Sequence, residues 1–397
     1  MDYFFIPLEQ NKKNQPSFIV LQGRIHKSCL GGLYTLKRFH LLRILKGFSH
    51  FTGAIFCLPC WLNYNHFHTR IPMHNINTLQ QLFTQYLQDN RVQKSPQALY
   101  EPFNYIMHIG GKRMRPVMTL LACYLFDEKV EKALPAALSV EVFHNFSLVH
   151  DDIMDAAPLR RGQPTVHDKY GLNSGILSGD VMLIFAYDYL RRSPRKEAIG
   201  GLYQTLTEVA IQVCEGQQYD IDFEQRDDVR LEEYLQMIEM KTAALLAGSL
   251  KMGAIAAGAP LSDQEHLSEF GRLTGIAFQI QDDFLDTFGD PEKVGKRVGG
   301  DIVQNKKTCL IIKALELADQ DTREQLLQLY TQQPAHQLEK IATVTKIFED
   351  LGIPDFLRNL RNDYQHRAYA HLAEVNAPKE KKDLLFGLAE SLLVREM

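Results

Sequence analysis

Apolar residues recur at three- and four-residue spacing along most of the chain after Met73. This spacing is typical of amphipathic α-helices, because every third or fourth residue lies on one face. The pattern predicts helices over 117–126, 133–150, 175–192, 203–221, 231–257, 264–286 and 307–318. Another helix is expected shortly after Met73, with Asn77 or Thr78 as its N-cap. Alternating strand patterns are scarce, so we predict an all-α fold.

Turn-forming residues separate the predicted helices, among them Pro102, Pro158, Pro260 and Gly299-Gly300. No Gly-, Ser- or Pro-rich linker divides residues 73–397, and no internal repeat of roughly 20 to 50 residues indicates a solenoid. The sequence therefore predicts one domain over 73–397, a single large helical bundle.

Residues 1–72 have a different composition. They carry a net charge of +7 and no sustained helical or strand period, whereas residues 73–397 carry −11. Three interpretations remain open: an Arg-rich targeting segment, an ordered extension, or upstream sequence translated ahead of a natural start at Met73. A zinc site at Cys57 and Cys60 with His66 and His68 is a weaker idea, because the spacing is short for a zinc finger.

Charge and cysteine content exclude several classes of protein. The acidic larger part argues against binding to nucleic acid. No run of about 18 apolar residues indicates a transmembrane segment. Six cysteines in a chain of 397 residues do not form a disulfide framework, so we expect a reducing compartment. That compartment is the cytoplasm, with organellar targeting by residues 1–72 as the alternative.

The most informative motif, DDxxD, occurs twice. HDDIMD spans 150–155 and QDDFLD spans 281–286, and each follows an apolar run late in a predicted helix. Residues i and i+4 lie above one another on a helix, so Asp151 stacks with Asp155 and Asp282 with Asp286. Stacked acids late in a helix repel one another and oppose the helix dipole.

A compensating cation would explain this arrangement. Oxygen ligands suit Mg²⁺, which prefers a few carboxylates together with water and substrate phosphates. Two solvated acidic helix ends are the simpler alternative, but the repetition of the motif makes that alternative weaker.

Basic residues form the second half of the pattern. In GGKRMRP (110–116), Lys112, Arg113 and Arg115 supply cationic donors beside a glycine pair that opens a helix, which suits phosphate binding. Further candidates for a bound anion are Arg160, Arg161, Lys241, Thr242, Lys296, Lys306 and Lys307. Each taken alone could be a solvated surface residue.

Together these motifs resemble the all-trans isoprenyl diphosphate synthases, the polyprenyl synthetase family. The resemblance covers residues 73–397 and rests on GGKRMRP, HDDIMD with LRRG, LSGD (177–180), KT (241–242), GIAFQIQDDFLD (275–286) and the GK…GGD…KKT loop. It implies the isoprenoid synthase fold, with the active site in a central cavity and usually a homodimer. It also implies Mg²⁺-dependent head-to-tail condensation of isopentenyl diphosphate with an allylic diphosphate.

The resemblance also assigns roles to residues. It implies that about three Mg²⁺ ions are held mainly by Asp151, Asp155 and Asp282, with Asp152, Asp283 and Asp286 in support. The allylic diphosphate would be held by Arg160, Lys241, Thr242, Gln279, Lys296 and Lys306, with Lys307 an alternative to Lys306. Isopentenyl diphosphate would be held by Lys112, Arg115, His144 and Arg161.

Phe146 and Ser147 lie five and four residues before Asp151, where the growing prenyl tail would pass. In the family a bulky residue here is associated with short products, so we expect geranylgeranyl or farnesyl diphosphate. If Phe146 is ordinary core packing, the stop lies deeper and a medium- or long-chain product is the alternative.

Two rival functions share parts of the pattern. A class I terpene cyclase has the first DDxxD, but its second metal motif normally mixes Asn, Ser or Thr with Glu. A non-catalytic regulatory subunit would be expected to lose aspartates or bases, and this sequence keeps them.

Overall fold

The computed structural model describes residues 74–290, 298–331 and 337–393, together with three strands near the N-terminus. The chain forms two compact units, Met1–Thr69 and Arg70–Met397. In the first unit, β1 (Asp2–Pro7), β2 (Phe18–Gly23) and β3 (Phe39–Leu41) form an antiparallel sheet in the order β1-β2-β3. Sequence periodicity did not indicate these strands. The interpretation of residues 1–72 as a targeting, extended or mistranslated segment stays a prediction, and Cys57, Cys60, His66 and His68 lie outside the described residues.

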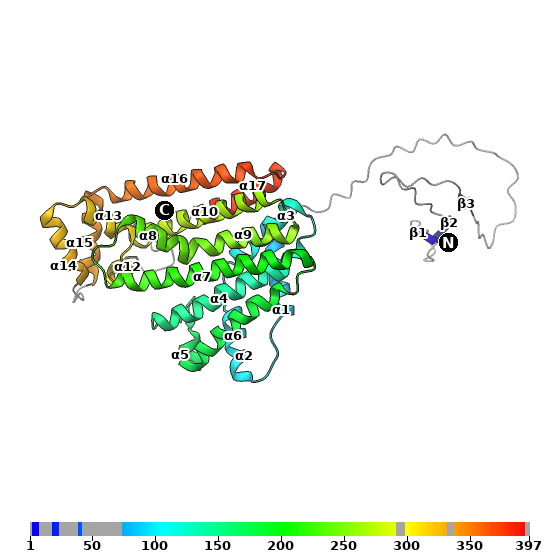
Figure 1. Ribbon diagram of the computed structural model, residues 1–397, viewed down its shortest axis with the longest axis horizontal. Coiled ribbons are helices and arrows are strands. Elements are labelled where there is room, and N and C mark those ends of the chain that lie inside the picture. Colours follow the sequence, from blue (N-terminus) through cyan, green and yellow to red (C-terminus); the bar gives the residue numbers. More distant parts are fainter. Residues whose placement is uncertain are drawn as a thin grey trace, which may run out of the picture. The chain divides into compact units, whose positions relative to one another are not determined.

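The second unit is helical almost throughout, as predicted (Figure 1). Its first half contains α1 (Ile76–Asp89), α2 (Gln97–His108), α3 (Met114–Phe126), α4 (Leu134–Met154), α5 (Val166–Tyr170), α6 (Leu172–Leu190) and α7 (Ile199–Glu224). Its second half contains α8 (Leu231–Ile238), α9 (Ala244–Ala257), α10 (Leu261–Phe288), α12 (Gly300–Val303), α13 (Cys309–Leu317), α14 (Gln320–Thr331), α15 (Gln337–Asp350), α16 (Ile353–Glu374) and α17 (Lys379–Leu393). Short 3₁₀ turns precede α4 and α7, and a two-residue hairpin, β4 (Leu159–Arg160) with β5 (Gln163–Pro164), follows α4.

Helix α9 is the central element of the bundle. It packs against α3, α7 and α10, and α10 in turn packs against α16, which runs alongside it in Figure 1. Nearly every residue of α9 is buried, from Ala244 to Ala256. A helix that is apolar on almost all sides is a core helix, and the alanines and glycines of α9 let the neighbouring helices approach closely. Buried side chains gather in two clusters, one around α3, α4, α6 and α9 and the other around α10, α13, α15 and α16.

The start of α1 differs from the prediction. Its N-cap is Asn75, whose side chain accepts a hydrogen bond from the Thr78 backbone N–H at 2.9 Å. The Thr78 hydroxyl accepts from the Asn75 N–H in return at 3.0 Å, which completes a capping box. Naming Asn77 or Thr78 as the cap was therefore wrong, because Thr78 is the third helical residue of the box.

None of the helices in the described part of the chain is long and apolar enough to cross a membrane.

Candidate active site

The first acidic motif closes helix α4, which extends to Met154 and so beyond the end predicted at residue 150. Asp151 and Asp152 lie in the last turn, and Asp155 is the C-cap. Asp151 keeps part of its side chain accessible, whereas Asp152 is only 1% exposed. Burial and the neighbouring Asp151 raise the pKa of Asp155, since both disfavour its charged form.

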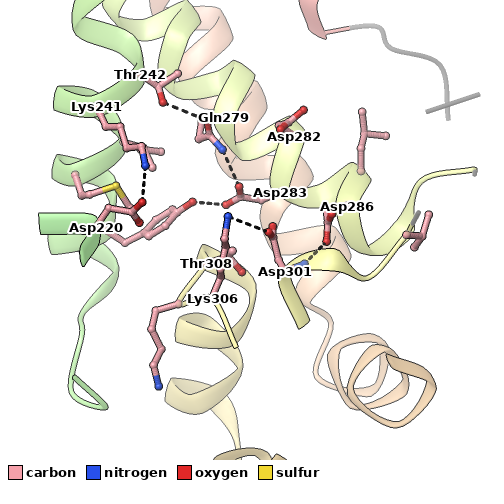
Figure 2. Close-up of a pocket in the computed structure, with 16 residues that line it drawn as sticks. Asp220, Lys241, Thr242, Gln279, Asp282, Asp283, Asp286, Asp301, Lys306 and Thr308 are labelled. Carbon is pink, nitrogen blue, oxygen red and sulfur yellow. Dashed lines mark hydrogen bonds and ion pairs between the residues drawn. The ribbon is translucent and has the colours of Figure 1, made fainter. Parts of the chain in front are cut away.

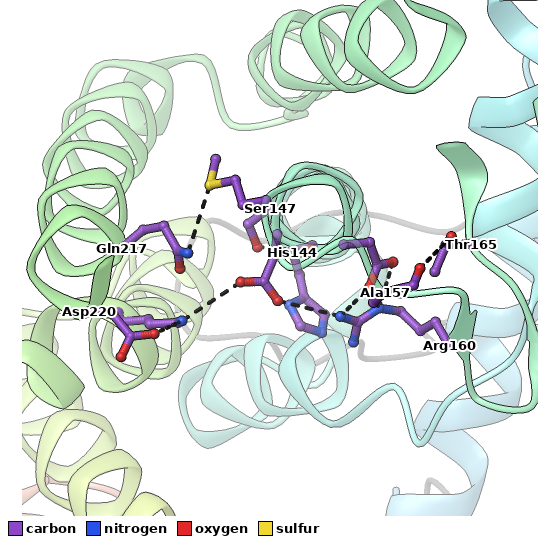
Figure 3. Close-up of polar contacts among 11 residues, drawn as sticks. His144, Ser147, Ala157, Arg160, Thr165, Gln217 and Asp220 are labelled. Atoms are coloured by element: carbon purple, nitrogen blue, oxygen red, sulfur yellow. Dashed lines mark hydrogen bonds and ion pairs between the residues drawn. The ribbon is translucent and has the colours of Figure 1, made fainter. Parts of the chain in front are cut away.

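Arg160 neutralises this end of α4. Its Nε donates to both carboxylate oxygens of Asp152 at 2.8 Å, and its Nη2 lies 3.4 Å from Asp151 Oδ2. The β4–β5 hairpin carries Arg160, and Thr165 anchors the hairpin by donating to the Ala157 carbonyl at 2.8 Å (Figure 3). A buried carboxylate paired with a forked guanidinium is well compensated, so Asp152 positions Arg160.

The second acidic motif lies near the end of α10. Asp283 is buried and is held from three sides: Tyr234 donates to its Oδ2, Cys309 donates to the same oxygen at 3.2 Å, and Gln279 donates to its Oδ1 at 3.0 Å. The Thr242 hydroxyl donates to Gln279 Oε1 at 3.2 Å and continues this row of contacts (Figure 2). Burial raises the pKa of Asp283 to about 6.

Lys241 and Thr242 lie in a π-helical turn, η3 (Glu239–Ala243), between α8 and α9. Such turns are rare and often mark functional sites. Helix α7 passes very close to this turn, because a Cβ at Gly216 would stand 2.4 Å from the Lys241 backbone nitrogen. The sequence indicated an ordinary helix here, since a single extra residue in a helical turn leaves the apolar spacing almost unchanged.

Lys241 joins the first acidic motif to a carboxylate that the sequence analysis missed. Its Nζ lies 2.5 Å from Asp220 Oδ2 on α7 and 3.7 Å from Asp151 Oδ1 (Figure 3). Asp220, like the motif aspartates, is an acid late in a long helix, and that feature could have singled it out. Burial alone would lower the pKa of Lys241. The two neighbouring carboxylates favour the charged amine more strongly, so the pKa is raised.

A short turn after α12 brings Lys306 into the same group of polar residues as Lys241. Asp301 is part of the GGD motif, but no role was predicted for it from the sequence. It donates its backbone N–H to Asp286 Oδ2 at 2.9 Å, and Lys306 Nζ lies 3.9 Å from Asp301 Oδ1. Burial, followed by the charge of Asp286, raises the pKa of Asp301 to about 7. Lys307 instead contacts Asp227 at 2.7 Å. Lys296 lies outside the described residues.

These groups surround a cavity of about 240 Å³ (Figure 2). Its walls bring together Lys241, Thr242, Gln279, Asp282, Asp283, Asp286 and Lys306. The first acidic motif adjoins the cavity through Lys241. The two DDxxD motifs, distant in sequence, therefore belong to one polar site.

A second cavity, of about 430 Å³, brings together the residues predicted to hold isopentenyl diphosphate. Lys112, Arg115, His144 and Arg161 line it, alongside apolar Met118, Leu246 and Phe278. Burial and the nearby arginines lower the pKa of His144 well below its usual value, so this imidazole is neutral. Burial also lowers the pKa of Arg115 to about 10, and the group remains charged at neutral pH.

Arg113 does not act as a third free cation of this loop, which corrects the expectation from GGKRMRP. It is the left-handed N-cap of α3, with φ of 51°. Its guanidinium turns inward and donates to the buried Glu141 and to the Met107 carbonyl, the latter at 2.5 Å. Arg113 therefore fixes the loop that bears Lys112 and Arg115. A sequence cannot separate an inward from an outward arginine in such a run.

The two predicted chain-length residues lie together on α4. Phe146 is buried, with its ring centroid 4.9 Å from that of His150 and 5.5 Å from that of Phe143. The Ser147 hydroxyl donates to the His144 carbonyl at 2.9 Å.

The oxygen donors of the site fit Mg²⁺ bound together with a ligand. Among the described residues, no three acidic, histidine or cysteine side chains converge closely enough to hold a metal ion alone. Magnesium commonly takes only one or two carboxylates and completes its shell with water and phosphate oxygens. Asp151, Asp155, Asp282 and Asp286 are of the right type for this role.

Known proteins resemble this chain over most of its length. The sequence model of the polyprenyl synthetase family matches residues 96–348. A short chain isoprenyl diphosphate synthase from Methanothermobacter thermautotrophicus is 36% identical over 313 residues, covering 78% of this chain and 95% of the relative. A geranylfarnesyl diphosphate synthase from Aeropyrum pernix is 36% identical over 308 residues, covering 76% and 95%.

Solved structures agree as well. A geranylgeranyl pyrophosphate synthase structure superposes with a TM-score of 0.78 at 41% identity, covering 82% of this chain and all of the other. A geranylgeranyl pyrophosphate synthase from Corynebacterium glutamicum, complexed with isoprenyl diphosphate and magnesium, gives a TM-score of 0.71 at 28% identity, covering 81% and 98%. The chain belongs to the polyprenyl synthetase family, and the predicted isoprenoid synthase fold and trans-prenyltransferase class are confirmed.

The buried Arg113–Glu141 pair gives a testable prediction. Glu141→Gln leaves the Arg113 guanidinium, 9% exposed, without its counter-charge. Removing one partner of a buried pair should lower the free energy of unfolding by about 3–5 kcal/mol. Urea unfolding followed by circular dichroism measures the change.

The matched control is Asp363→Asn on α16, which breaks an exposed pair with Arg367. Its expected cost is below about 1 kcal/mol. Equal effects of the two substitutions would contradict a structural role for Glu141.

Proposed function

We propose that this chain condenses isopentenyl diphosphate head-to-tail with an allylic diphosphate to give a short-chain all-trans prenyl diphosphate. The observation that carries the proposal is a pair of cavities, to which the consecutive α10 residues Phe278 and Gln279 each contribute a wall. One is lined by acids with interspersed lysines, and the other is lined by Arg and Lys next to apolar side chains. The names of the relatives support the same reaction.

The acidic cavity suits the allylic diphosphate. Its phosphate oxygens would meet Lys241, Thr242, Gln279 and Lys306, with Arg160 at the end of α4 and Lys296 as the remaining predicted contact. Asp220 and Asp151 hold the Lys241 ammonium, and Asp283 orients the Gln279 amide. Held donors lose little freedom when a ligand binds, and they stabilise charge without reorganising.

Magnesium is the metal we assign to this site. Asp151, Asp155 and Asp282 would hold about three Mg²⁺ ions, with Asp286 in support. Asp152 and Asp283 have strong contacts within the protein, so their role is to position Arg160 and Gln279 rather than to ligate directly. When bound, Mg²⁺ supplies positive charge that stabilises the leaving diphosphate. The magnesium in the Corynebacterium glutamicum relative supports this choice.

The second cavity suits isopentenyl diphosphate. Lys112, Arg115 and Arg161 provide cations for its diphosphate, and neutral His144 contacts Arg115 Nη1 at 3.3 Å. Met118, Leu246 and Phe278 provide an apolar wall beside them. Such a wall excludes water from the allylic carbocation until the double bond attacks. The released proton would go to the departed diphosphate, so no side-chain base is assigned.

Product analysis tests the function. The purified chain is incubated with Mg²⁺, isopentenyl diphosphate and each of dimethylallyl, geranyl and farnesyl diphosphate. We expect prenyl diphosphates longer than the primer, no turnover of the primer alone, and loss of activity in EDTA. Asp282→Ala should lower kcat at least about 100-fold, because it removes charge stabilisation in the transition state. Turnover of the primer alone would instead indicate a terpene cyclase.

Product length follows from Phe146, which is wedged between Phe143 and His150 on the same helix. Its ring would block the tail, and the names of the relatives span geranylgeranyl and geranylfarnesyl products, with a longer-chain product as the alternative. Phe146→Ala should lengthen the main product by at least one isoprene unit, as measured by chromatography. Val149→Ala, another truncation of a buried α4 residue, should leave the product unchanged. Identical products from Phe146→Ala and the parent would remove Phe146 as the stop.

We also propose that the chain forms a homodimer through α6. Helix α6 exposes Leu172, Ile176, Leu177 and Ile184, the last being 66% exposed. An apolar face of this kind is typical of an interface, and a second copy would cover it by two-fold symmetry. Ile184→Lys should convert a dimer to a monomer in analytical ultracentrifugation, whereas Leu261→Lys, at an exposed position of α10, should not. A monomeric parent would contradict the dimer. Cytoplasmic location stays a prediction.

A further inference from the structure

Lys340 is a buried lysine that belongs to none of the recognised motifs. It lies on α15 and is 4% exposed, and no other lysine or arginine in the described part of the chain is as inaccessible. Its ammonium donates a hydrogen bond to Asn305 Oδ1 and lies 5.1 Å from the centroid of the Tyr330 ring. A buried cation is costly unless such contacts compensate for lost water. This cost indicates that the position has a specific task.

Asn305 forms the left-handed turn that ends α12, with φ of 60°. The turn is closed by a hydrogen bond from the Lys306 N–H to the Asp301 carbonyl at 3.0 Å. Asparagine tolerates this conformation better than most residues, but its side chain needs a partner when it is partly buried. Because Lys306 follows directly, the geometry of Asn305 sets the direction in which Lys306 leaves the turn.

Helix α15, which carries Lys340, also contacts the other end of the turn through Ile341. Gly299 has φ of +84°, and a Cβ at that position would lie 2.8 Å from the side chain of Ile341. The Gly299 N–H donates to the Asp286 carbonyl at 2.6 Å, which ties the turn to α10. Lys340 and Ile341 therefore hold the two ends of the segment that carries Asp301 and Lys306.

We propose that Lys340 is a positioning residue that acts through Asn305 to fix the turn presenting Lys306 to the allylic diphosphate. The proposal rests on the proposed function and extends it to a residue that does not touch substrate. Loss of this positioning should weaken binding of the allylic diphosphate alone. The residues assigned to isopentenyl diphosphate lie elsewhere, on α3, α4 and the β4–β5 hairpin, or directly before α3.

Lys340→Met removes the ammonium and keeps an unbranched apolar chain of similar length. Its KM for the allylic diphosphate should rise about fivefold, the effect of one lost hydrogen bond, while its KM for isopentenyl diphosphate stays unchanged. The matched control is Lys346→Met on the same helix, where the lysine is exposed and pairs with Asp350. A general loss of folding would lower kcat without separating the two KM values. An unchanged allylic KM, or an equal rise in both, would overturn the proposal.

A second variant tests the route through Asn305. Asn305→Gly keeps the left-handed turn without the side chain, so adding Lys340→Met to it should change the allylic KM no further. A full fivefold effect in that background would show that Lys340 does not act through Asn305.

Hydrogen exchange of the amides between residues 299 and 306 gives a readout independent of turnover. These amides should exchange faster in Lys340→Met than in the parent or in Lys346→Met, without any substrate. Equal rates would overturn the positioning role even in an active enzyme. Faster exchange in Lys340→Met, combined with a parent that does not condense the substrates, would reject the proposed function alone.

Discussion

The site depends on how the protein compensates the negative charge of aspartates that lie near helix C-termini. At that end the helix dipole disfavours negative charge. Two helices, α4 and α10, each carry three aspartates near the C-terminal end, and one aspartate of each triplet is almost fully buried. Carboxylates in such positions repel one another and oppose the helix dipole. The fold answers with cations from elsewhere in the chain, Arg160 at α4 and Lys306 near α10, while Lys241 from the π turn contacts Asp151. The remaining negative charge is the feature that a divalent cation would satisfy.

The aspartates of one motif have different tasks. Asp152 and Asp283 are buried and accept hydrogen bonds within the protein, and they hold Arg160 and Gln279 in place. Asp151 lies toward the more accessible side and shares Lys241 with Asp220. The same division occurs among the bases, since Arg113 supports the loop from which Lys112 and Arg115 face the second cavity. The site therefore contains two sets of groups. One set faces the cavities, and the other is buried and fixes the orientation of the first.

Periodicity and motifs predicted much of this arrangement. The helical core and the grouping of Lys241, Thr242 and Gln279 with the second acidic motif follow from apolar spacing and from the resemblance, and the cavity linings agree with them. Asp220, Tyr234 and Lys340 were not predicted, because they contact Lys241, Asp283 and Asn305 from helices that are distant in sequence. Asp301 was recognised only as part of the GGD motif, and its contact with Asp286 depends on tertiary packing. The inward turn of Arg113 and the π turn at Lys241 depend on tertiary packing, which leaves almost no trace in local spacing.

Calorimetric titration of the full chain with inorganic pyrophosphate, with and without Mg²⁺, tests most directly whether the two acidic helix ends act as one metal–diphosphate site. We expect weak binding of pyrophosphate in EDTA, tight binding with Mg²⁺, and loss of the Mg²⁺ effect in Asp282→Ala although the α4 motif is intact. Pyrophosphate binding of equal strength with and without Mg²⁺, or an undiminished Mg²⁺ effect in Asp282→Ala, would contradict a single metal–diphosphate site.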